Sequence, residues 1–277
     1  LMKIIKKIIN FTIYILIRLK ILKLPNKSLR VLMFHDIGNF SDFKKQIYAL
    51  KKNWKFINPE DFYKIVEGKK KITERYLLLT FDDGFKSNLI VAKKFLKKLK
   101  LKAIIFVPLK FILLKDRIKK KNFIINNLKV KYSSNQMDSL DIKDLQTFRQ
   151  LKFTIGSHTF SHVNLKNLKD KTKLRFEIIE SANRLQKLLK TKINNFSFTF
   201  GRLNDISQKS LLLSKKRFKY IYTGIRGENL NNSRLIFRDN VLPNDKVYDL
   251  YAYLSGYLDF LYFNERKIIK KNFKKNI

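Results

Sequence analysis

The sequence predicts an α/β fold in which a parallel sheet curls into an imperfectly closed barrel. Short apolar runs alternate along the chain with longer segments of helical periodicity, as they do in parallel α/β proteins. The apolar runs are continuous, without a polar residue at every second position, which is typical of strands buried on both faces. About seven such runs are present, one fewer than a complete eight-stranded barrel requires.

Each predicted element has the composition of its class. The strands are rich in Val, Ile, Leu and Phe and cover residues 30–34, 55–58, 76–81, 103–107, 153–156, 195–200 and 220–223. The helices lie between them, at residues 42–52, 59–66, 87–100, 141–150, 169–190 and 207–217. Asn58 before Pro59 is typical of a helix cap followed by a proline at the first helical position. Asp141 and Asp144 form a variant of the capping box.

A single barrel domain accounts for residues 26–263. Within it, residues 109–137 are rich in Lys and Asn and lack clear periodicity, so we expect a lid or a flexible insertion there. Residues 264–277 form a basic tail, for which we expect a frayed end. Residues 1–25 form a separate segment that is both basic and apolar.

The N-terminal segment has Lys3, Lys6 and Lys7 before an apolar run at residues 8–17. Roughly ten apolar residues are too few for a membrane-spanning helix, which needs about twenty, and no small-residue cleavage site follows. An uncleaved anchor, an interfacial basic helix and a packed first helix all remain open. We expect a segment close to a membrane, and therefore a protein of the cell envelope or membrane-associated on either side; a cytoplasmic location also stays open.

The chain has a formal net charge of +39, three histidines and no cysteine. Without cysteine, a metal site must be built from His, Asp and Glu. Most of the positive charge is lysine spread along the whole chain, together with much Ile, Asn and Phe, a composition typical of an AT-rich genome. We find no basic helix with heptads, no zinc-finger spacing and no aromatic RNA-binding signature, so no nucleic-acid partner is expected. The charge favours an anionic membrane or envelope surface as a partner.

Two adjacent carboxyl groups follow the predicted strand at residues 76–81: Asp82 and Asp83 precede Gly84. Two like charges side by side are costly unless a cation or a proton separates them. Gly84 permits a sharp turn, so both side chains can face one site. A polar turn that caps the next helix is the alternative interpretation.

The three histidines, His35, His158 and His162, each follow the end of a predicted strand, where parallel α/β folds place their functional sites. On a helical turn, His158 and His162 would lie on one face, with Cβ atoms about 5–6 Å apart. With Asp83 they would form a site of two histidines and one aspartate that leaves coordination positions open for water. Open coordination is typical of catalytic metal sites.

These residues resemble a known family. Residues 80–84 and 158–162 are similar, in order, to the first two motifs of the polysaccharide deacetylases, the NodB-like carbohydrate esterases. The resemblance covers roughly residues 30–241 and implies a distorted (β/α)7 barrel of the polysaccharide deacetylase type. It also implies that Asp82 is the catalytic base and that Asp83, His158 and His162 bind a divalent metal, with zinc expected.

The third family motif is altered at residues 196–201. Thr199 replaces a proline, and Ser197 stands in place of the arginine that holds the base. Arg238 is our candidate to replace that arginine, and the backbone N–H of Phe200 is our candidate donor to the oxyanion.

The family's C-terminal histidine, its usual general acid, is also missing, because no histidine follows His162. Residues 31–37 resemble the N-terminal segment of the exopolysaccharide N-deacetylase branch, in which an N-terminal histidine takes the acid role. The resemblance therefore implies that His35 is the acid; a structural histidine bonded at the strand end is the alternative.

We expect a hydrolase that removes N-acetyl groups from amino sugars of a cell-surface or envelope polysaccharide or oligosaccharide. Three alternatives remain. The first is a catalytically impaired carbohydrate-binding or assembly protein on the same barrel, and the second is a basic nucleic-acid-binding protein. The third is a hydrolase that uses the same chemistry on an O-acetyl ester or another amide.

Overall fold

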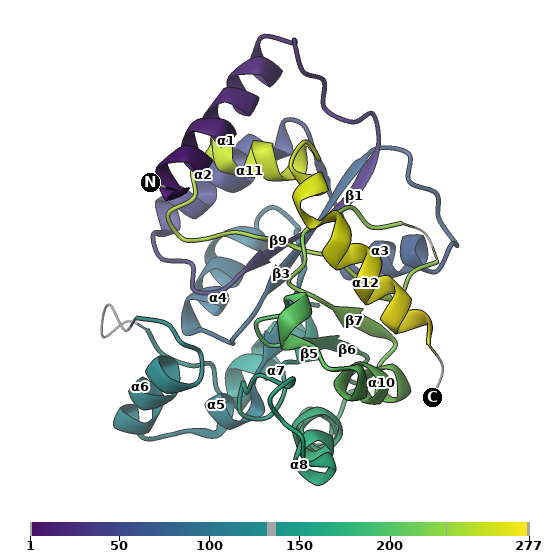
Figure 1. Cartoon of the computed structure of the whole chain (residues 1–277). Coiled ribbons are helices and arrows are strands. Elements are labelled where there is room, and N and C mark those ends of the chain that lie inside the picture. The colour runs from purple at the N-terminus through teal and green to yellow at the C-terminus, as the bar shows by residue number, and fades with distance from the viewer. Residues whose placement is uncertain (1, 132–136, 231, 276–277) are drawn as a thin grey trace.

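The structure is a computed structural model that describes residues 2–131, 137–230 and 232–275. A curled parallel sheet is surrounded by helices (Figure 1). All seven predicted strands are present, and the chain adds two short strands that were not predicted. The strands are β1 Ser28–Phe34, β2 Lys55–Phe56, β3 Arg75–Phe81, β4 Ala103–Val107, β5 Thr154–Ser157, β6 Asn195–Ser197, β7 Tyr220–Tyr222, β8 Leu235–Ile236 and β9 Asp239–Asn240.

The strand order is β8-β7-β6-β5-β4-β3-β1-β9, and β2 pairs with the first half of β3. β8 and β9 lie at the two ends of this order, yet only Phe237 and Arg238 separate them in the chain. The side-chain amide of Asn229 adds a second link, because it donates to the carbonyl groups of Leu29 in β1 (3.4 Å) and of Phe237 after β8 (3.0 Å). The two edges of the sheet therefore meet, and the predicted distorted barrel is confirmed.

The sheet separates two apolar cores. Leu78 of β3 and Phe106 of β4 belong to the core inside the barrel, whereas Leu79 and Phe81 of β3 belong to the outer core beneath the helices. Side chains alternate between the faces of a strand, so Asp82 continues the inward face that Leu78 occupies. The sequence thus places this carboxyl group at the carboxyl-terminal mouth of the barrel, where (β/α) barrels hold their functional groups.

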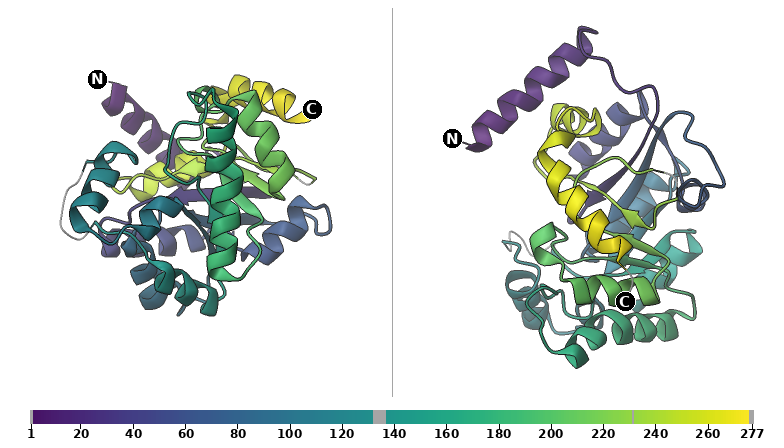
Figure 2. Two further views of the ribbon diagram at one scale, coloured as in Figure 1. Left: turned by 90° about the horizontal axis from the view of Figure 1, so that it is seen from below. Right: turned by 45° about the vertical axis from the view of Figure 1, so that its right-hand side comes forward.

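Helices cover the outside of the sheet (Figures 1 and 2), and all six predicted helices are present. Two of them contain π-helical turns, η1 and η2. Pro59 begins α3, and Asp141 and Asp144 form the predicted capping box of α7. The helical segments are α1 Met2–Arg18, α2 Phe40–Lys51, α3 Pro59–Val66, α4 Lys86–Val91, η1 Ala92–Leu96, α5 Leu109–Leu113, α6 Arg117–Asn126, α7 Ile142–Gln150, α8 Lys171–Arg175, η2 Phe176–Glu180, α9 Ser181–Leu189, η3 Leu203–Asp205, α10 Gln208–Arg217, α11 Val247–Leu254, η4 Asp259–Tyr262 and α12 Phe263–Lys274.

The prediction of a frayed C-terminal tail is wrong, because most of it forms α12. Ile269 is buried, and Phe273 one turn later packs against the outer core. Gln208 of α10 donates to the carbonyl of Asn272 at 3.0 Å. Apolar residues four apart give a lysine-rich helix one face that it can bury, and the basic composition concealed that pattern.

The N-terminal segment forms α1, which packs on α11 and so corresponds to the third of the interpretations left open. Asn10 is buried and donates to Asp249 at 2.6 Å. The ring of Tyr14 meets that of Tyr251 edge-on, with centroids 5.3 Å apart. Among the described residues, no helix combines the length and the apolar character needed to cross a membrane.

We expected a lid or a flexible insertion at residues 109–137. Residues 109–131 of this segment have a defined fold, and residues 132–136 lie outside the described part of the chain. α5 and α6 form a small core of their own, in which the rings of Phe111 and Phe123 stack with centroids 4.9 Å apart. Phe85, which follows the Asp-Asp-Gly turn, joins this core. The described part of the insertion is thus attached to the mouth of the barrel.

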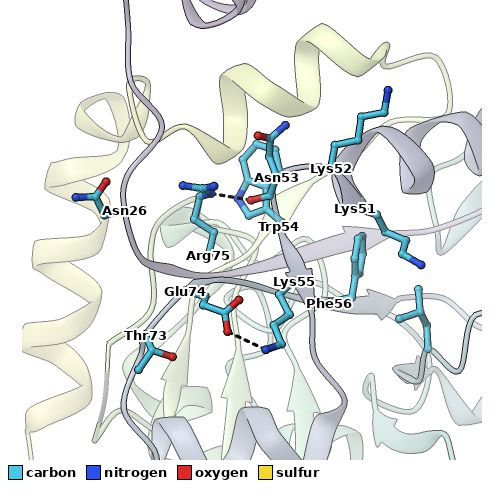
Figure 3. A pocket seen from close by; sticks show the side chains of 11 residues that line it. Asn26, Lys51, Lys52, Asn53, Trp54, Lys55, Phe56, Thr73, Glu74 and Arg75 are labelled. Atoms are coloured by element: carbon cyan, nitrogen blue, oxygen red, sulfur yellow. Dashed lines mark hydrogen bonds and ion pairs between the residues drawn. The ribbon is translucent and has the colours of Figure 1, made fainter. Parts of the chain in front are cut away.

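A hollow of about 640 Å³ lies near the amino-terminal ends of β2 and β3, beside Trp54 (Figure 3). Arg75 donates there to the backbone carbonyl of Asn53 at 2.6 Å, and Lys55 pairs with Glu74 in solvent. Its lining includes none of the three histidines. The candidate chemistry therefore lies at the other end of these strands.

Candidate active site

A cavity of about 360 Å³ at the carboxyl-terminal mouth of the barrel brings the predicted residues together. Its lining includes the three histidines and both adjacent aspartates, His35, His158, His162, Asp82 and Asp83. The side-by-side pairing of β1 and β3 explains the position of His35: their last residues are partners, so the residues that follow, His35 and Asp82, lie next to each other.

The Asp-Asp-Gly segment turns through two consecutive left-handed residues. Asp83 has a φ of 71°, and Gly84 also has a φ of 71°. A non-glycine residue in this conformation is strained and is usually held there by its surroundings. A Cβ on Gly84 would approach side-chain atoms of Val107 and Ile112 to 3.0 Å. The predicted sharp turn is confirmed, and Asp83 itself contributes to it.

His158 and His162 do not lie on a helical turn, so that prediction is wrong. The backbone between them is irregular, with positive φ at Thr159 (66°) and at His162 (56°). The carboxylate of Glu177 in η2 holds this loop by accepting hydrogen bonds from the backbone N–H groups of residues 160 and 161, both at 2.9 Å. The two imidazole rings converge nonetheless, with centroids 5.0 Å apart.

Asp83, His158 and His162 can hold a metal ion, because their ligand atoms all lie within 4.8 Å of one another. Oδ1 of Asp83 is 3.2 Å from Nε2 of His162 and 3.6 Å from Nε2 of His158. That oxygen is buried and has no hydrogen-bond partner among the residues that the structure describes. Two nitrogens and one oxygen in such an arrangement suit a divalent cation such as zinc.

Both imidazoles are oriented from behind by backbone carbonyl groups. Nδ1 of His158 lies 2.8 Å from the carbonyl of Ser197, and Nδ1 of His162 lies 3.0 Å from that of Asn127. A neutral imidazole that donates from Nδ1 presents an unprotonated Nε2, which is the form that binds metals. Three lone pairs thus face one point in the cavity, and the residues fit a cation there.

The charges of this cluster depend on one another. Burial favours a raised pKa for Asp83, but the neighbouring His162 and His158 overcome it and hold the pKa of that carboxyl well below its ordinary value. Burial also acts to lower the pKa of His162, and the carboxylate of Asp83 overcomes it and raises that pKa. Each group therefore favours the charged form of the other.

Asp82 is held by Arg238, the residue that we expected to replace the missing motif arginine. Nη1 of Arg238 lies 2.7 Å from Oδ1 of Asp82, and Nη2 lies 2.8 Å from Oδ2. Ser197 Oγ donates to Oδ2 at 3.1 Å and accepts from Arg238 Nη2 at 2.7 Å. Burial favours a raised pKa for Asp82, but the guanidinium overcomes it and lowers that pKa. The carboxylate is thus ionised and fixed in position.

Phe200 forms part of the cavity wall. Its ring meets that of His162 edge-on, with centroids 5.0 Å apart, and its φ of 58° is left-handed. The replaced motif residue before it, Thr199, donates from its hydroxyl to the carbonyl of Val163 at 2.5 Å. This bond links the altered third motif to the residue that follows the loop of residues 158–162, which we call the histidine loop.

Sequence reasoning missed two residues that shape the site. Glu177 looked like one of many charged residues on a long helix, and only its three acceptor contacts with the loop, including one from the hydroxyl of Ser161, distinguish it. Asn127 acts through its backbone carbonyl, and its side chain donates to the carbonyl of Ser161 at 2.8 Å. Any residue has a carbonyl, so no sequence signal could have identified this contact.

Comparisons with known proteins identify the family and the fold. The family model described as polysaccharide deacetylase matches residues 69–214. YxkH of Bacillus subtilis strain 168, a protein assigned to the polysaccharide deacetylases, is 24% identical over 191 residues, 66% of this chain. The match spans 60% of the length of YxkH.

Two solved structures share the fold. The Streptococcus pyogenes deacetylase PplD in complex with acetate has a TM-score of 0.66 at 19% identity, over 83% of this chain and 99% of PplD. IcaB from Ammonifex degensii has a TM-score of 0.64 at 17% identity, over 84% of this chain and 100% of IcaB.

Proposed function

Since the chain belongs to the polysaccharide deacetylase family, we propose that it is a metal-dependent hydrolase that removes N-acetyl groups from amino sugars of an envelope or cell-surface polysaccharide. One observation carries the proposal: a three-residue ligand set and a carboxylate fixed by arginine line the same cavity. Metal ligands alone are also found in structural metal sites. The adjacent ionised carboxylate supports a hydrolytic site, because hydrolysis needs a base.

In this proposal Asp83, His158 and His162 hold the cation, with zinc as the expected metal. A bound divalent cation supplies Lewis-acid chemistry, polarising the acetamide carbonyl and lowering the pKa of water. Asp82 accepts the proton of the attacking water. Arg238 keeps Asp82 ionised and aimed at the cavity, as the contacts of both carboxylate oxygens support.

His35 and Phe200 complete the proposed mechanism. An amide nitrogen leaves readily only when it is protonated, and His35, which follows β1 and lines the same cavity, is the proposed donor of that proton. The backbone N–H of Phe200 is proposed to stabilise the oxyanion. The products are acetate and a sugar with a free amine.

The shape of the site supports an oligomeric substrate. The cavity is at the lower end of the range of about 300–1,000 Å³ for small-molecule pockets, so it suits one sugar unit and its acetamide. Beyond Phe200 and His162, which line both spaces, lies a more open hollow of about 640 Å³ that includes Asn126, Asn164 and Asn167. Amide side chains suit sugar hydroxyl groups, so neighbouring units of a chain would fit there.

The proposal is tested by measuring acetate released from N-acetylglucosamine oligomers, with and without a chelator. We expect release that the chelator abolishes and zinc restores. A protein that binds the oligomers but releases no acetate under any metal would be the carbohydrate-binding alternative. If acetate is released only from O-acetylated sugars, the site hydrolyses esters and not amides.

A further inference from the structure

We propose that α1 docks the protein onto the surface of an anionic lipid bilayer, lying in the interface without crossing it. One face of this helix is apolar and exposed. Ile4, Ile8, Phe11 and Ile15 of the helix and Leu19 directly after it follow one another at intervals of three or four residues, and their exposed fractions are 62%, 59%, 50%, 37% and 64%. Phe11 lies at the edge of this face, where its ring also meets that of Tyr248 of α11, with centroids 5.6 Å apart. Residues at this spacing share one face.

The opposite face fixes α1 to the body of the protein. The buried hydrogen bond from Asn10 to Asp249 and the edge-on contact of Tyr14 with Tyr251 hold it on α11. The helix therefore cannot rotate its apolar face inward without breaking a buried polar contact. In Figure 2 (right) α1 lies at the periphery of the molecule, over α11. The apolar face is thus permanently presented to the outside.

Charge identifies the partner. Lys7 and Arg18 of α1 and Lys20 and Lys23 directly after it are exposed, and residues 1–35 contain no Asp or Glu. A second copy docked by the same face would bring these cations against their own equivalents. An anionic bilayer satisfies both features, because it accepts apolar side chains into its interface and attracts the basic residues around them. The helix has 17 residues, several of them basic, which suits an interfacial position.

This inference goes beyond the proposed deacetylation and does not depend on it. The test is co-sedimentation of the full chain with vesicles of phosphatidylcholine that contain about one quarter phosphatidylglycerol, compared with phosphatidylcholine alone. We expect strong binding to the anionic vesicles and weak binding to the neutral ones. Ile8→Ser combined with Ile15→Ser should lower the partition coefficient at least about tenfold, because it removes apolar side chains that enter the interface.

A matched pair of residues on another helix provides the control. Lys187 and Leu188 of α9 repeat the order of Lys7 and Ile8, and Leu188 is 42% exposed. α9 continues from α8 and η2, and α8 lies at the opposite end of Figure 1 from α1. Leu188→Ser and Lys187→Gln should leave vesicle binding unchanged, whereas Lys7→Gln should weaken it. Circular dichroism and thermal melting should show that all variants remain folded.

Two results would overturn the proposal. One is undiminished vesicle binding by the Ile8→Ser, Ile15→Ser variant; the other is a dimer in light scattering that this variant converts to a monomer, which would assign the face to a second copy. Acetate release from soluble oligomers should be unaffected by both substitutions. Failure of that release in the unaltered protein would count against the deacetylase proposal alone.

Discussion

Arg238 forms two hydrogen bonds with Asp82, of 2.7 and 2.8 Å, across 156 residues of sequence. Both side chains are almost completely buried. The contact exists because Arg238 lies in the two-residue connection between β8 and β9, where the edges of the sheet meet. Arg238, which lies where the edges of the sheet meet, thus binds Asp82 in place of the arginine that the third motif lacks at Ser197.

Replacement of this guanidinium should impair both the fold and the base. Arg238→Gln leaves the carboxyl group of Asp82 buried without its cation, and breaking a buried pair costs about 3–5 kcal/mol. The pKa of Asp82, which Arg238 now lowers, should rise under burial alone. On acidification, the variant should then lose activity at a higher pH than the unaltered protein does. The acid limb of the pH profile of kcat/KM measures this shift. Arg175→Gln, which alters a solvent-exposed pair with Glu180, is the control and should leave that limb in place.

Asp82→Asn should separate catalysis from metal binding. The amide cannot accept the proton of water, so kcat should fall about 10²–10⁴-fold. Asp83, His158 and His162 are untouched, so the metal content should stay the same by elemental analysis. Full turnover in this variant would remove Asp82 from the role of base. Asp42→Asn, at an exposed helix start, should be neutral in both measurements.

His158→Ala should remove the metal. The substitution leaves one histidine and one carboxylate, too few protein ligands for a typical catalytic zinc site, which has about three. Elemental analysis after dialysis should find the metal strongly depleted, and acetate release should be absent. Full metal occupancy in the variant would contradict the ligand assignment.

Glu177→Gln tests whether the carboxylate of Glu177 positions the histidine loop. The carboxylate accepts hydrogen bonds from the backbone of residues 160 and 161 and from the hydroxyl of Ser161, and an amide has only one acceptor oxygen to replace them. Metal affinity should fall about 10–100-fold, as for other groups that orient metal ligands. Glu180→Gln, three residues later on the same turn and 40% exposed, is the matched control. Equal zinc affinities for the two variants would show that Glu177 does not position the loop.

Glu67 should make the fold depend on pH. Hydrogen bonds from Lys219, Lys69 and Tyr220 lower the pKa of this carboxyl to about 2, and they connect the end of α3 to β7. A carboxyl group whose pKa is lower in the folded chain stabilises the protein above the unfolded pKa, and this contribution disappears as the pH falls through the folded pKa.

Glu67→Gln should therefore lower the free energy of unfolding by about 1 kcal/mol near pH 7, where solvent screening limits the gain. The difference from the unaltered protein should shrink steadily below about pH 4. Urea denaturation at several pH values measures it. Glu74→Gln, in the exposed pair with Lys55, should have an effect below about 0.5 kcal/mol throughout. A pH-independent difference for Glu67→Gln would contradict the linkage.

The sequence was sufficient to predict which residues line the candidate site, because these residues are few and rare. Asp82 and Asp83 follow a buried strand, and a chain with only three histidines leaves little choice of ligands. Arg238 was identified as a substitute only because the arginine expected at Ser197 was missing. Its location was not predictable, since β8 and β9 have two residues each and carry no periodic pattern.

The geometry of the histidine loop was beyond sequence reasoning for a different reason. A four-residue spacing is equally compatible with a helical turn and with a loop, and the left-handed backbone at Thr159 and His162 leaves no mark in residue type. The C-terminal helix was missed because its lysines outnumber its buried residues, of which Ile269 is the main one. In both segments, tertiary contacts determine the backbone conformation, and the local residue pattern does not specify it.

The junction between β8 and β9 also determines when the candidate active site can be completed during synthesis. During synthesis, Asp82, Asp83, His158 and His162 leave the ribosome long before Arg238 does. A nascent barrel that ends before β8 contains Asp83, His158 and His162 but lacks the guanidinium that lowers the pKa of the buried Asp82. If the proposed hydrolase activity needs an ionised Asp82, this activity requires the last strands of the barrel, and an unfinished or C-terminally cleaved chain should be inactive.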